Sequence, residues 1–97
     1  MATFISLVSL TQHGEEEIKQ STERAQGFAE MAARIGATVK DVYWTLGGYD
    51  GVLIFDAPDD ETATALLLSL GSKGNVRTKT LRAFNSEQIT GILNSLP

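Results

Sequence analysis

Two stretches of this chain are apolar on both sides of an extended backbone, and they limit the fold more than any other feature. The first is Thr3–Leu10 and the second is Tyr49–Ala57. In the first stretch Phe4 falls on one face of a strand, and Ile5 and Leu7 fall on the other. A strand that is apolar on both faces lies at the centre of a sheet, with a further layer against each side. The chain therefore needs a sheet in which these two strands are central.

An amphipathic helix is predicted after the first strand. Apolar and small residues recur at spacings of three and four from Ile18 to Ile35, which is typical of a helix with one buried face. Gly36 is expected to end this helix. The Ser21-Thr22 pair can interrupt it, because hydroxyl side chains compete for backbone hydrogen bonds.

The other elements follow from local patterns. Thr38–Leu46 is predicted to be a strand with one polar face, joined to the next strand by a two-residue turn at Gly47-Gly48. A second helix is expected to begin at Asp59, whose side chain can cap the first turn, and to end at Gly71. Val76–Phe84 is predicted to be a polar, β-branched strand.

The predicted order of elements is βαββαβ, followed by a short helix capped by Ser86. This order is typical of the ferredoxin-like α+β fold, in which the first and third strands form the centre of the sheet. We therefore predict a single domain over residues 1–97. Because the helices of this fold cover only one sheet face, we expect a second copy of the chain to cover the other, giving a homodimer or a higher even oligomer.

Composition and charge argue against several classes of protein. The chain has no cysteine, so it has no disulfide and no thiolate metal site, and we expect a cytoplasmic location. Met1–Leu10 lacks the unbroken apolar run of a signal peptide. The net charge of -4 argues against nucleic-acid and membrane partners. An RNA-recognition sheet is also not expected, because Asp50 and Gly51 stand where that fold needs a small residue and an exposed ring.

The acidic and basic residues are unevenly distributed. No acidic residue occurs between Glu61 and Glu87, a stretch that contains four cations. These cations would either meet an anion or keep an edge strand from pairing with another sheet. They are Lys73, Arg77, Lys79 and Arg82.

Three segments of the chain resemble the GYD domain family of small bacterial proteins. They are Leu46–Val52, which contains Gly-Tyr-Asp, then Ala57–Glu61, and the longer Gly74–Phe84. The likeness runs nearly end to end. It implies a dimeric α+β barrel, in which two ferredoxin-like sheets face one another. It implies no particular reaction, because the family is largely without assigned activity.

Five side chains are candidates for a ligand site. Asp50 needs a partner, because a carboxylate near the start of a central strand is unfavourable when unpaired. Arg82 is the leading candidate partner, with Tyr43 or Tyr49 nearby. Such a cluster would either transfer a proton on a small ligand or only hold the hairpin together. His13, predicted in a loop after the first strand, would either line a pocket or be simply solvated.

Two kinds of function remain open at this point. The first is a non-catalytic small-molecule-binding or interaction module whose dimer barrel holds a small molecule. The second is a cofactor-independent enzyme of the oxygenase or isomerase type, acting on a small aromatic or polar metabolite, by analogy of architecture alone. A closed, polar-floored cavity around Asp50 would favour the enzyme. No cofactor is expected, and no metal site either, because His13 is the only histidine.

Overall fold

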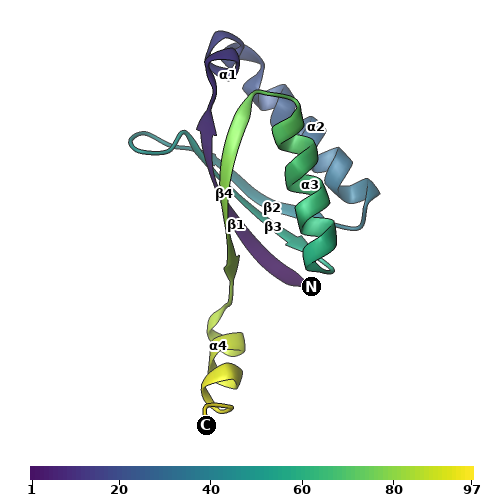
Figure 1. Cartoon of the computed structure of the whole chain (residues 1–97), viewed down its shortest axis with the longest axis vertical. Helices are drawn as coiled ribbons and strands as arrows, with labels where there is room; N and C mark the ends of the chain where they lie inside the picture. Colours follow the sequence, from purple (N-terminus) through teal and green to yellow (C-terminus); the bar gives the residue numbers. More distant parts are fainter.

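The computed structural model describes residues 1–97 as a four-stranded sheet with helices on one face and one helix projecting from the domain (Figure 1). The elements in chain order are β1 (Ala2–Leu10), α1 (Gln12–Glu16), the 3-10 turn η1 (Ile18–Gln20), α2 (Ser21–Arg34), β2 (Thr38–Trp44), β3 (Gly51–Ala57), α3 (Asp60–Ser72), β4 (Val76–Ala83) and α4 (Ser86–Leu93).

The strands have the order β2-β3-β1-β4, so β1 and β3 are the central pair. All neighbours are antiparallel. Phe4 on β1 lies opposite Phe55 on β3 and opposite Arg82 on β4. This confirms the predicted ferredoxin-like α+β fold, and the two stretches that are apolar on both faces are the two central strands.

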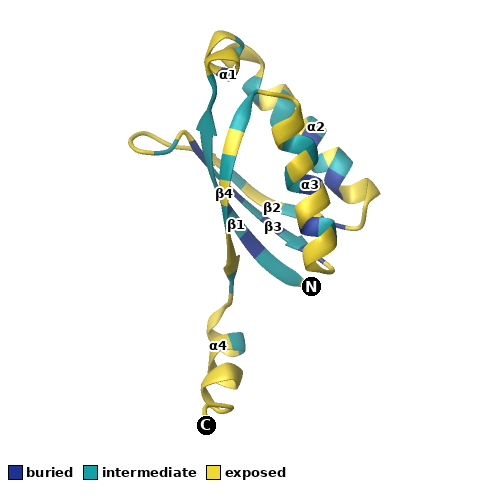
Figure 2. Ribbon diagram, in the orientation of Figure 1, coloured by how far each residue is buried: buried dark blue, intermediate teal, exposed yellow.

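The core lies between the sheet and helices α2 and α3, which cover the same face (Figures 1 and 2). The rings of Phe4 and Phe55 stack at a centroid distance of 5.3 Å. Phe28 of α2 and Leu66 of α3 are buried against them. Ser6 is fully buried in the same layer, where its hydroxyl lies 2.7 Å from that of Thr80. One small core therefore holds both helices to the sheet.

The opposite side of the sheet has no helix on it, and we call it the open face. Side chains alternate along each strand, so the residues next to the core-facing ones point to the open face. Ile5 lies between Ile54 of β3 and Leu81 of β4, and Leu7 lies opposite Val52. Leu81 is 54% exposed. The open face is therefore apolar at its centre, as the sequence predicts.

The connection between β2 and β3 differs from the predicted two-residue turn. The strands separate after Trp44 and rejoin at Gly51. Thr45 closes the base of the loop, because its N–H donates to the carbonyl of Asp50 at 3.0 Å and its hydroxyl donates to that of Tyr49 at 2.6 Å. Only Gly47 of the glycine pair has a positive φ, +116°. The prediction was wrong because these hydrogen bonds outside the ladder widen the hairpin.

The predicted helix from Ile18 to Ile35 is interrupted on its N-terminal side. The interruption comes before Ser21, where η1 separates α1 from α2. Thr11 fixes α1, since its N–H donates to the carbonyl of Asn75 at 3.1 Å and its hydroxyl accepts from the N–H of Gly14. A Cβ on Gly14 would lie 2.0 Å from the Asn75 oxygen. Anchoring of α1 to the start of β4 therefore sets where α2 can begin.

The C-terminal helix α4 projects away from the rest of the domain (Figure 1). Asn85 caps it, with Gln88 completing a reciprocal capping box, so the prediction of Ser86 as the cap was wrong by one residue. Its apolar side is exposed, with Ile92 at 42% and Leu93 at 56%. No helix of the structure has the length and apolar character that a membrane span requires.

Candidate functional site

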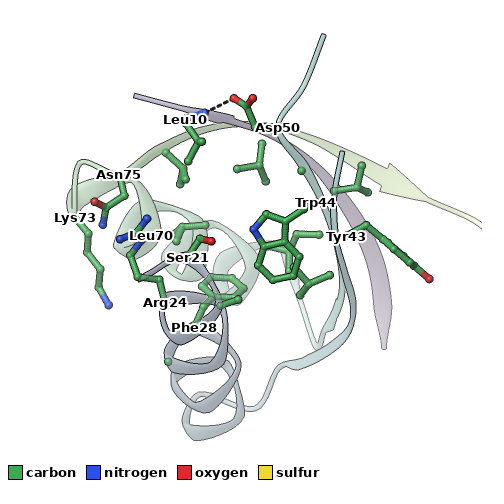
Figure 3. Close-up of a pocket in the computed structure, with 18 residues that line it drawn as sticks. Leu10, Ser21, Arg24, Phe28, Tyr43, Trp44, Asp50, Leu70, Lys73 and Asn75 are labelled. Carbon is green, nitrogen blue, oxygen red and sulfur yellow. Dashed lines mark hydrogen bonds between the residues drawn. The ribbon is translucent and has the colours of Figure 1, made fainter. Parts of the chain in front are cut away.

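A cavity of about 200 Å³ opens between helix α2 and one end of the sheet (Figure 3). Its walls come from the end of β1, from β2 and β3 beside their hairpin, from the first half of α2, and from the connection between α3 and β4. This is the site where the chain brings polar and aromatic side chains together around free space.

The floor and sides of the cavity are mostly apolar. Leu53 and Phe28 are each 5% exposed and belong to the core. The indole of Trp44 projects into the space from β2 (Figure 3). Gly27 on α2 adds room, since a Cβ built there would meet no atom within 4 Å. An apolar ring is therefore the kind of group that the cavity can surround.

Arg24 places a positive charge on the wall formed by α2. Its Nη1 donates a hydrogen bond to the backbone carbonyl of Glu17 at 3.0 Å. This carbonyl lies where the helix is interrupted. Its Nη2 is buried and has no hydrogen-bond partner. Buried donors nearly always have a hydrogen-bond acceptor in native structures, so we expect an acceptor to lie next to this nitrogen.

Asp50 lies at the rim of the cavity and is held by the backbone of β1. Its carboxylate accepts a hydrogen bond from the N–H of Leu10 at 2.8 Å, and its own N–H donates to the carbonyl of Val8 at 2.8 Å. In Figure 3 the carboxylate points away from the cavity towards Leu10. The expectation that Asp50 is hydrogen-bonded is confirmed.

The expected pairing of Asp50 with Arg82 is wrong. Arg82 lies opposite Phe4, whereas Asp50 immediately precedes Gly51, the residue that pairs with Val8. Phe4 and Val8 are four residues apart, so at about 3.4 Å per residue these positions are separated by about 14 Å along β1. The Arg82 guanidinium instead lies 4.4 Å from the centre of the Phe84 ring.

The other predicted site residues do not gather around Asp50. Tyr43 is 55% exposed and its ring points away from the cavity, although the residue borders the cavity (Figure 3). Tyr49 lies in the β2–β3 loop, where its carbonyl accepts from the hydroxyl of Thr45. His13 is exposed on α1 rather than in a loop. A ligand-binding role for these residues stays a prediction.

Sequence reasoning missed Arg24 and Trp44 as site residues. A signal for Arg24 was present, since it lies three residues after Ser21 and four before Phe28, on the buried side of the helix. A charged residue on such a face is rarely buried without a partner. For Trp44 the sequence offers only its alternation with Tyr43 along the strand, which puts the two rings on opposite faces, and the structure places Trp44 at the cavity.

The arrangement is suited to binding. The lining of the cavity is mainly apolar, and the one carboxylate at its rim accepts a hydrogen bond from a backbone N–H and points away from the space. No cluster of three or more histidine, aspartate or glutamate side chains is placed to hold a metal ion. The cavity is an apolar recess with hydrogen-bond donors on its wall.

Comparisons with known proteins agree with the fold. A protein of Thermus thermophilus described as "Glutamine synthetase and cystathionine beta-lyase binding protein" is 38% identical over 84 residues, which is 86% of this chain and 88% of that protein. A crystal structure from the same organism has a TM-score of 0.55 at 27% identity and covers 89% of this chain and 96% of that chain. The sequence profile of the GYD domain matches residues 4–93, so the chain belongs to the GYD domain family.

Proposed function

We propose that this protein is a non-catalytic interaction module that acts as a homo-oligomer and binds other proteins. The observation that carries this proposal is the open face of the sheet, which is apolar and uncovered. The name of the Thermus relative supports the same reading, because that protein is described as binding two enzymes. Enzymes of these two kinds are therefore the first partners to test.

The open face needs a covering layer. Ile5, Leu7, Val52 and Ile54 form its centre and are only partly buried in the single chain. Stable domains place two layers of secondary structure around such a surface. Contiguous apolar patches of more than a few hundred Å² on a soluble protein mark interaction sites. A second sheet laid on this face would give the dimeric α+β barrel.

The charges at the two edges of the open face favour a second copy of the chain as the covering layer. Asp41 lies on the β2 edge, while Arg77 and Lys79 lie on the β4 edge. A two-fold axis parallel to the strands would bring the β2 edge of one copy opposite the β4 edge of the other. Opposite charges would then face each other along both edges of the paired sheets, which favours this arrangement of the two copies over others. The cations of β4 would thus serve assembly as well as protecting an edge.

Helix α4 supplies a second uncovered surface. Ile89, Ile92 and Leu93 lie on one side of it and are all exposed. An isolated helix this short is marginal in water, and packing of an apolar side is what stabilises such helices. In the proposed oligomer, α4 packs on a neighbouring copy, as exchanged terminal elements commonly do.

A cofactor-independent enzyme is the second candidate, and the cavity beside Asp50 is the observation in its favour. The apolar floor of the cavity and the outward direction of the Asp50 carboxylate support ligand binding better than proton transfer.

We also propose a cytoplasmic location, because a chain without cysteine needs no oxidising compartment.

Binding to purified glutamine synthetase and cystathionine beta-lyase tests the proposed function. The chain would be immobilised and each enzyme passed over it in biolayer interferometry, with lysozyme as an unrelated control. The proposal predicts saturable binding to at least one of the two enzymes and none to lysozyme. Equal responses for all three proteins, or none at all, would contradict the protein-binding part of the proposal.

A further inference from the structure

We propose that the cavity beside α2 binds a small organic carboxylate with a ring-sized apolar body, and that Arg24 holds the carboxylate. This site goes beyond the proposed protein-binding function and does not rest on it. The open face and the cavity lie on opposite sides of the sheet, so either can be occupied without the other.

The first step is the unpaired nitrogen of Arg24. Its guanidinium lies on the cavity wall opposite the indole of Trp44 (Figure 3), and Nη2 is buried without an acceptor. The only ion pair of the chain joins Lys40 to Asp56, so no acidic side chain neutralises Arg24. A guanidinium presents its N–H groups in a planar fork that matches the two oxygens of a carboxylate. A bound carboxylate would therefore supply the missing acceptor.

The second step is the character of the other polar groups. Ser21, Lys73 and Asn75 also line the cavity, and hydroxyl, ammonium and amide groups can all donate hydrogen bonds. Asp50 is the only acidic residue of the lining, and its carboxylate is turned towards Leu10. The free hydrogen-bonding capacity of the site is thus mainly donor capacity. An anion matches it and a cation does not.

The third step is the size and the walls of the space. Phe28, Val42, Leu53 and the Trp44 ring provide apolar contact on several sides. The volume is about 200 Å³. A cavity of about 150 Å³ with apolar walls is large enough to bind benzene. A ring carrying one short carboxylate arm therefore fits, whereas a nucleotide or a folded peptide does not.

Gly27 offers a way to close the site without damaging the core. A side chain at this position would enter free space, because no atom lies within 4 Å of the point that its Cβ would occupy. Leucine also favours helix more than glycine does. The substitution Gly27→Leu is therefore expected to leave the domain folded while occupying the space that the ring of the ligand needs.

The test uses phenylacetate as the probe and phenylacetamide as its uncharged counterpart. Both would be titrated into the full chain and followed by amide chemical shifts in NMR. We expect phenylacetate to bind more tightly than the amide by about 10-fold to 100-fold, the range of a hydrogen bond to a charged group. The largest shifts are expected at Gly27 and Gly51, which line the cavity.

Three variants separate the proposed contact from general effects. Arg24→Gln should remove the preference for the acid, and Gly27→Leu should abolish binding of both compounds. Arg34→Gln, a change at an exposed arginine of the same helix, should leave the preference intact. Equal affinity for acid and amide in the wild-type chain, or no binding of either, would overturn the proposal, and this result needs no variant to fold. A folded Arg24→Gln protein that keeps the preference would overturn it as well.

Discussion

The carboxylate of Asp50 accepts a hydrogen bond from the backbone N–H of Leu10 at 2.8 Å, across the end of the sheet. This contact joins the β2–β3 loop to the last residue of β1. It turns the carboxylate away from the cavity and ties the rim of the cavity to β1. Asp50 is therefore best understood as a positioning residue for the hairpin.

Substitution of Asp50 tests this role. Asp50→Leu is expected to lower the free energy of unfolding by about 0.5–1.5 kcal/mol, because the N–H of Leu10 loses its acceptor at a solvent-exposed position. Asp50→Asn should lose less, since its amide oxygen can still accept. Urea unfolding of the three proteins would measure the difference. Equal stability of Asp50→Leu and wild type would show that the contact does not hold the loop.

The packing of α1 against the start of β4 predicts a contrast between two glycines. Gly14→Ala should destabilise the domain by about 1–3 kcal/mol, because the new methyl group would collide with the Asn75 carbonyl. Gly27→Ala, inside α2 with free space around it, should stabilise it by up to about 1 kcal/mol. Thermal unfolding followed by circular dichroism would compare them. Similar melting temperatures for both variants would contradict the anchoring of α1.

The start of α3 predicts a pH dependence. Hydrogen bonds from the side chain and the backbone N–H of Thr62 hold the pKa of Asp59 below its usual value. A carboxylate with a lowered pKa stabilises the fold above its unfolded pKa, and this contribution disappears as the pH falls through the folded pKa. The gap in melting temperature between wild type and Asp59→Ala should therefore be full at neutral pH and shrink in acid.

Asp59→Asn is the matched control for this pH effect. Asparagine is an effective cap without a titrating group. The difference in melting temperature between Asp59→Asn and Asp59→Ala should therefore persist in acid. If this difference shrinks as steeply as the difference between wild type and Asp59→Ala, another group is responsible for the pH dependence.

Exposure of the apolar side of α4 predicts a role in assembly. Ile92→Lys should raise the dissociation constant of the oligomer, because it places a charge on the side proposed to pack on a neighbouring copy. Asn94→Lys, a change on the other side of the helix end, should have little effect. Sedimentation at several concentrations would compare the two. An unchanged dissociation constant for Ile92→Lys would show that α4 lies free in the oligomer.

The fold could be read from the sequence because its decisive signal is local. Apolar residues on both faces of β1 and β3 identify the central strands wherever they pair, and Asp59 marks a helix start by its side chain alone. The Asp50–Arg82 pairing could not be read in this way. It depends on register, and a shift of a few residues along β1 moves a side chain to the other end of the sheet.

The cavity could not be predicted from sequence patterns either. It lies beside the interruption of the helix before Ser21 and beside the widened hairpin, and the segment before Ser21 is anchored by a hydrogen bond between distant residues, from the N–H of Thr11 to the carbonyl of Asn75. The nearest sequence signal was the charge of Arg24 on an otherwise buried helix face. Recognising that its Nη2 lacks a partner requires the packed structure.

Sedimentation velocity at micromolar concentration tests the central claim, that the open face joins copies of this chain. Wild type is predicted to sediment as a dimer or a higher even oligomer. Leu81→Lys, on the open face, should shift it towards monomer, whereas Leu68→Lys, at an exposed leucine of α3 on the opposite side of the sheet, should not. A wild-type chain that sediments as a monomer, or an oligomer equally unaffected by both substitutions, would contradict the account.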